Sequence, residues 1–71
     1  MADSVYKFIE LVGTSSESWE KAAAAAVTQA SKSVRDLRVA EIVQFDVAIE
    51  NGKIKSYRAK VKLSFKIESQ G

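Results

Sequence analysis

The chain has 71 residues, of which 46% are hydrophobic and 28% charged, and its net charge at pH 7 is +2. This composition is ordinary for a soluble protein, and we expect residues 1–71 to form one domain. Because Cys and His are absent, disulfides, thiolate metal sites and histidine base catalysis are excluded, and we expect no enzyme. A chain this short buries only about 60% of its unfolded surface alone, which predicts that oligomerisation adds stability.

The sequence also bears on location. No apolar stretch approaches the roughly 20 residues that a membrane span needs, and the apolar run Val5–Val12 is interrupted by Lys7 and Glu10. The segment Met1–Ser4 is not basic, unlike the start of a secretory signal. We therefore expect a cytoplasmic protein with no membrane partner.

The first expected element is a strand. Val5–Val12 is rich in β-branched and aromatic residues, and Gly13 is predicted to end the strand. The polar residues that follow are candidate N-caps for a helix. Thr14 with Glu17 fits a capping box, and Ser15 is an equally good cap.

A helix is expected from about Ser16 to about Arg35. Its marker is the run Ala22–Ala26, five alanines in a row, because alanine is the strongest helix former. The apolar residues at helical spacing are Trp19, Ala23, Ala26, Ala30 and Val34, with Val27 beside them, and we expect Trp19 to be part of the core. A face of small side chains buries little area, at about 25 cal/mol per Å², so this helix again points to contacts between subunits.

Two further strands are predicted, Leu37–Ile49 and Ile54–Ile67. The second of these alternates cleanly between apolar and polar residues, which indicates a sheet with one face on a core. The apolar face of the first is assigned Leu37, Val39, Val43, Phe45, Val47 and Ile49. The apolar face of the second is assigned Tyr57, Ala59, Val61, Leu63, Phe65 and Ile67.

The turn between these strands sets their register. A two-residue turn at Asn51-Gly52 would pair Phe45 with Arg58 and so bring an apolar face against a basic one. A three-residue loop, Glu50–Gly52 with a bulge at the glycine, pairs Phe45 with Tyr57 and matches the faces. We predict the three-residue loop.

The expected fold is α+β, a β-α-β-β subunit in which one helix packs on a three-stranded antiparallel sheet of order 1-3-2. The helix returns the chain, so the third strand fits between the first two with a right-handed crossover. The sheet face away from the helix is then polar, and we expect solvent, a partner or a ligand there.

Three weaker signals remain open. Gly13-Thr14-Ser15 before a helix could offer backbone N–H groups to a phosphate, although an ordinary helix cap has the same pattern. The basic residues Arg58, Lys60, Lys62 and Lys66 could contact a nucleic-acid backbone, but their acidic neighbours and the low net charge favour a solvated or inter-subunit face, so we expect no nucleic-acid partner. Carboxylates are the remaining hard-metal ligands, with Asp46 and Glu50 as candidates for calcium, and such a site needs further ligands from other subunits, backbone carbonyls or water.

The sequence resembles the dodecins along nearly its whole length. The resemblance rests on the opening run Val5-Tyr6-Lys7…Glu10-Leu11-Val12-Gly13-Thr14-Ser15, on Ser18-Trp19-Glu20, on Leu37-Arg38, and on Phe65-Lys66-Ile67-Glu68. It implies a hollow homododecamer of cubic 23 symmetry that stores flavins, FMN or riboflavin; some similar proteins also bind coenzyme A.

The resemblance places the family's flavin pocket at Val39, Gln44, Asp46 and Arg58. Val39 stands where flavin-binding members carry a stacking Trp, Arg58 where they carry a Gln, and Asp46 where a basic residue is frequent. These replacements look like a flavin-less subgroup described as calcium-binding. The resulting hypothesis is a non-enzymatic dodecameric binding or storage protein for calcium or another small ion. The alternatives are a dodecin that binds flavin with weakened stacking and a cage with no ligand.

Overall fold

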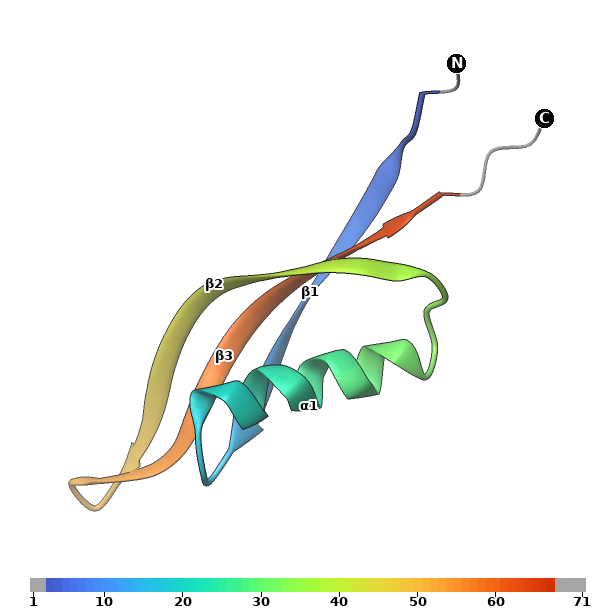
Figure 1. Cartoon of the computed structure of the whole chain (residues 1–71). Coiled ribbons are helices and arrows are strands. Elements are labelled where there is room, and N and C mark those ends of the chain that lie inside the picture. The colour runs from blue at the N-terminus through green and yellow to red at the C-terminus, as the bar shows by residue number, and fades with distance from the viewer. Residues whose placement is uncertain (1–2, 68–71) are drawn as a thin grey trace.

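The computed structural model describes residues 3–67 and contains four elements (Figure 1). They are β1 (Tyr6–Ser15), α1 (Trp19–Ser31), β2 (Leu37–Glu50) and β3 (Lys53–Lys66). The strands form one antiparallel sheet in the order β1-β3-β2, and α1 lies along one face of it, which confirms the predicted fold. Two of the sequence predictions reach beyond the described residues. Met1 and Ala2 belong to the segment that was predicted not to be a secretory signal, and Glu68 belongs to the closing motif of the resemblance.

Gly13 was predicted to end the first strand, but β1 continues through it to Ser15. A Cβ atom added at Gly13 would lie 1.9 Å from the carbonyl oxygen of Ala22 and 3.1 Å from the Ala26 Cβ. The glycine therefore marks the place where the helix backbone packs directly on the strand. The glycine at this position is thus explained by close packing of the helix and not by a turn.

The start of the helix also differs from the prediction. Its N-cap is Ser18, whose hydroxyl accepts a hydrogen bond from the Lys21 N–H at 3.1 Å. The predicted caps Thr14 and Ser15 both belong to β1. Ser15 instead shapes the turn before the helix, where its hydroxyl accepts from the Glu17 N–H at 3.0 Å.

The helix ends at Ser31, four residues before the predicted Arg35. Lys32 is the C-cap, and its N–H donates to the carbonyl of Gln29 at 3.2 Å. Asp36 then adopts a left-handed conformation with φ of 59°, which turns the chain into β2. Among the described residues, no helix is long and apolar enough to cross a membrane.

The buried core is small and lies between α1 and the middle of the sheet. It consists of Ala22, Ala26, Ala30, Ala59, Val61 and Leu63. Ala22 was missing from the predicted helix face, and Trp19, which was predicted to be core, is 37% exposed. Large apolar side chains stay exposed on the single subunit, Phe45 at 53% and Ile49 at 67% among them. Such an exposed apolar surface favours the expected contacts between subunits.

The predicted register between β2 and β3 was wrong. The strands are joined by the two-residue turn Asn51-Gly52, in which both residues have positive φ, 52° and 74°. A register shift between Ile49 and Ala48, two pairs from the turn, then restores the match of the faces, so that Phe45 pairs with Ala59 and not with Tyr57. Phe45 lies on the face that was predicted for it, but its partner on β3 lies two residues beyond the predicted Tyr57.

Further bulges change which side chains of β2 face the helix. The register shifts again between Ile42 and Gln44 and between Leu37 and Val39. As a result Val39 pairs with Ser64 and lies on the polar face, where the sequence pattern had placed it on the apolar one. Val39 is 58% exposed.

Candidate ligand-binding face

The face of the sheet that points away from α1 is called here the outer face. Because opposite residues in antiparallel strands share a face, the register assigns the outer face without ambiguity. Its residues are Tyr6, Phe8, Glu10, Val12 and Thr14 from β1, Arg58, Lys60, Lys62, Ser64 and Lys66 from β3, and Val39, Glu41, Gln44, Asp46 and Ala48 from β2. All four residues predicted for the ligand pocket therefore lie on one face.

The charges of the outer face alternate from strand to strand. Lys62 on the central strand lies opposite Glu10 on one side and opposite Glu41 on the other. The Lys62 ammonium also lies 4.6 Å from the centre of the Phe8 ring. The basic residues of β3 thus stand among carboxylates, which argues against a continuous nucleic-acid contact.

Asp46 and Arg58 form a two-point ion pair on the outer face. Arg58 Nε donates to Asp46 Oδ1 at 2.7 Å, and Nη2 donates to Oδ2 at 3.2 Å. The hydrogen bond from Arg58 holds the pKa of Asp46 below its usual value, and the charges of Arg58 and Lys60 act in the same direction. The same hydrogen bond raises the pKa of Arg58. The two residues lie directly opposite each other, whereas the predicted register had set them diagonally.

A hollow of about 200 Å³ lies beside this ion pair. It is lined by Val12, Gln44, Asp46, Arg58 and Lys60. The structure thus gathers three of the four predicted pocket positions and adds Val12 and Lys60, which pair with each other across β1 and β3. The register of β2 and β3 places Lys60 opposite Gln44, and the register of β1 adds Val12.

Val39 does not line the hollow. Its partner Ser64 lies four residues along β3 from Lys60, so Val39 stands farther along the same face. The bulge between Ile42 and Gln44 lies between the two regions. Within one subunit, the charged hollow and the apolar side chain of Val39 are therefore two separate features of the outer face.

The two predicted calcium ligands are both engaged by cations. Asp46 is held by Arg58, and the Glu50 carboxylate lies 3.5 Å from the Lys55 ammonium at the hairpin. Between residues 3 and 67 no three acidic side chains come together as a set of metal ligands. Calcium takes six to eight oxygen ligands, so a single subunit does not fit the ion.

The helix start is a poor phosphate site. Of the N–H groups around this start, those of Glu17 and, at 3.5 Å, Ser18 donate to the Ser15 hydroxyl, and that of Lys21 donates to the Ser18 hydroxyl. The structure therefore favours the reading of Gly13-Thr14-Ser15 as a strand end followed by a helix cap.

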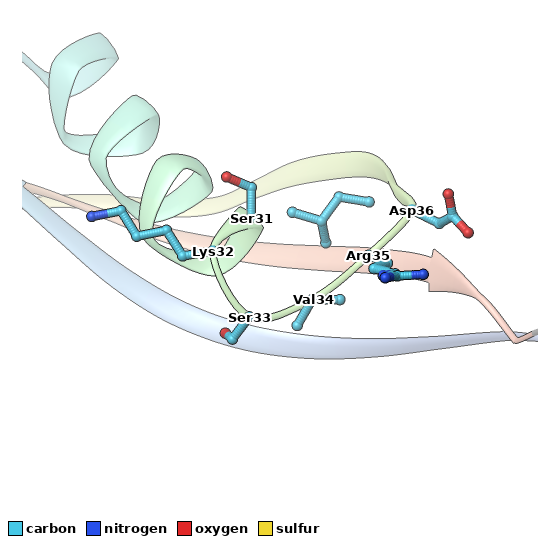
Figure 2. Close-up of a pocket in the computed structure, with 7 residues that line it drawn as sticks. Ser31, Lys32, Ser33, Val34, Arg35 and Asp36 are labelled. Carbon is cyan, nitrogen blue, oxygen red and sulfur yellow. The ribbon is translucent and has the colours of Figure 1, made fainter.

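A second hollow, of about 570 Å³, lies at the opposite end of the helix. Figure 2 shows the turn that lines it, with residues 31–36 labelled between α1 and β2. A neighbouring hollow of about 560 Å³ extends it to Lys7, Phe65, Lys66 and Ile67. None of the predicted site residues lies in either hollow.

Comparison with known proteins agrees with this geometry. The Dodecin family model matches residues 5–68. Calcium dodecin of Mycobacterium tuberculosis is 52% identical over 65 residues, which are 90% of each chain. Its crystal structure, described as a calcium-chelating antigen with a novel calcium-binding site, matches with a TM-score of 0.81 and 48% identity over 96% of this chain and 99% of the other. The structure of dodecin from Streptomyces coelicolor matches with a TM-score of 0.89 and 34% identity over 99% and 100%.

Proposed function

The chain belongs to the dodecin family, and on this premise we propose that it is a non-enzymatic binding or storage protein that assembles into a hollow homododecamer. The small core and the exposed Phe45 and Ile49 support assembly, because a lone subunit leaves much apolar surface in water. The absence of His and Cys supports a binding role over catalysis. A cytoplasmic location belongs to the same proposal.

The observation that carries the choice of ligand is the pairing of Asp46 with Arg58 on a face whose family stacking position is Val39. Valine has no aromatic ring, and ring stacking contributes about 0.5–1.5 kcal/mol for each pair beyond burial. Arg58 is held by a carboxylate instead of offering a neutral amide to a flavin ring. The outer face thus suits a small ion better than a stacked flavin.

Calcium is the ion we propose, since a relative that is 52% identical is named a calcium dodecin. Asp46 and Glu50 are the proposed ligands from this chain. Because one subunit does not supply enough oxygens, further ligands have to come from neighbouring subunits, backbone carbonyls or water. The proposed calcium site is therefore a property of the assembly.

Isothermal titration of the assembled protein with calcium chloride tests this proposal. We expect Asp46→Asn to weaken binding, while Asp36→Asn, which removes one carboxylate at the other end of β2, binds as the unchanged protein does. Melting curves with millimolar calcium give a second readout, because a bound ligand stabilises the folded state. Absence of stabilisation in the unchanged protein, or equal binding by Asp46→Asn, would contradict the calcium site.

Flavin binding is the second candidate, since the hollow keeps Gln44 and lies on the family's ligand face. Two aromatic stacking contacts per site, which Val39 does not supply, would account for about one to two decades of affinity for a flavin. Titration of riboflavin or FMN should therefore give no micromolar quenching with the natural chain. Val39→Trp should gain quenching, because Val39 is exposed enough for an indole to lie on the outer face. Tight quenching without the substitution would favour the flavin alternative.

A further inference from the structure

Trp19 occupies an unusual place for the chain's only tryptophan. It is the first residue of α1, is 37% exposed, and reaches β2, the strand on which the helix packs least. Its indole Nε1–H donates to the backbone carbonyl of Asp46 at 3.1 Å. The helix leans mainly on β1 and β3, so this bond is a specific tie between the helix and β2.

The indole also contacts the aromatic neighbours of both partners of the ion pair. Its ring centre lies 5.5 Å from that of Phe45 and 5.1 Å from that of Tyr57, the second in an edge-to-face arrangement. Phe45 precedes Asp46 and Tyr57 precedes Arg58, and successive side chains of a strand point to opposite faces. Trp19 thus touches, from the helix side, the same two strand segments that carry the ion pair on the outer face.

We propose that Trp19 is a positioning residue for the outer face, which holds the backbone at Asp46 and the aromatic pair behind it so that the Asp46 carboxylate stays on Arg58. As the ligand role of that face is itself proposed, the importance of this device for binding rests on the proposed function. The coupling between the indole and the ion pair does not rest on the proposed function, because it depends on contacts within one subunit. By the reciprocity of coupled sites, a change at the ion pair also acts on the indole.

The first test needs no ligand. In protein labelled with ¹⁵N, the indole gives one Nε1–H signal per subunit, since the chain has a single Trp. Asp46→Asn and Arg58→Gln, which touch only the outer face, should each move this signal by more than its linewidth. Lys62→Gln, a matched change of charge on the same face and four residues away along β3, should leave it in place. An indole that ignores both ion-pair substitutions, or responds equally to Lys62→Gln, overturns the proposal.

The second test measures binding of calcium chloride by Trp19→Phe, which keeps a ring against Phe45 and Tyr57 but removes the N–H donor. Loss of one hydrogen bond predicts binding that is weaker by roughly two- to tenfold. Lys21→Gln, an exposed change on the same helix turn, should bind as the unchanged protein does. Unweakened binding by Trp19→Phe overturns the positioning role. If the unchanged protein binds no calcium, the proposed function fails, and the indole signal still decides the coupling.

Discussion

The two faces of the sheet are built on opposite principles. The helix side carries the buried core, with Ala22 and Ala59 wholly buried and Val61 and Leu63 as the largest fully buried side chains. The outer face carries alternating charges on three strands and a two-point ion pair that is partly open to solvent. One face therefore tolerates almost no change of volume, while the other tolerates changes of volume and responds to changes of charge.

This contrast shows where stability and binding reside. The alanine face lets the helix lie directly on β1, but it buries too little area to make a large core. The apolar surface that remains exposed is available for other subunits. Substitutions on the outer face leave this buried core unchanged, so a binding function proposed for that face can change without loss of the fold.

The largest effect is expected from Gly13→Ala on the helix side. The new Cβ would clash with the Ala22 carbonyl oxygen, a backbone atom, so the helix would have to move away from β1. We expect little folded or assembled protein by circular dichroism and size-exclusion chromatography. Gly52→Ala is the control, because a Cβ there meets nothing within 4 Å and costs only about 1–2 kcal/mol for its positive φ. Equal behaviour of the two variants would contradict the account of Gly13.

Truncation of the core is expected to have the next largest effect. Leu63→Ala should lower the free energy of unfolding by about 2–5 kcal/mol, since Leu63 is 1% exposed and its loss leaves a cavity. Lys62→Ala, one residue away on the outer face, should change it by less than about 1 kcal/mol. Urea unfolding at one fixed protein concentration measures both, because assembly makes apparent stability depend on concentration. Comparable losses would mean that the two faces do not differ as described.

The smallest effect is expected from Asp46→Asn, and it should depend on pH. The Asp46 pKa is lowered in the folded state, so the ion pair contributes stability above the unfolded carboxyl pKa of about 3.9. That contribution is lost as the pH falls through the lowered folded pKa. Melting temperatures of the variant and the unchanged protein should differ slightly at neutral pH and converge in strong acid. High salt should also reduce the difference, and a gap that widens in acid would contradict the assignment.

Much of the fold followed from sequence patterns. The clean alternation of β3 and the alanine run of α1 are strong local signals, and together with the crossover rule they specified the strand order. The ends of the elements were harder. From the sequence alone Gly13 is interpreted as a strand end, because the sequence does not distinguish a glycine in a turn from a glycine packed against a helix.

The outer face was only partly predictable. Asp46 and Arg58 were expected near each other, but the bulges that align them and turn Val39 outward depend on how β2 bends around the sheet. Trp19 was assigned to the core because its spacing matched the helix face, although its bond to Asp46 requires the tertiary structure. Neither the alternation nor the helical period carries that information.

Native mass spectrometry of the purified protein, with calcium and riboflavin offered in turn, tests the central claim most directly, because it reports subunit number and bound mass together. We predict a particle of twelve times the 7.8 kDa subunit mass that takes up calcium and, with Val39 unchanged, retains no riboflavin. Monomers or small oligomers, or a dodecamer that carries riboflavin and ignores calcium, would contradict it.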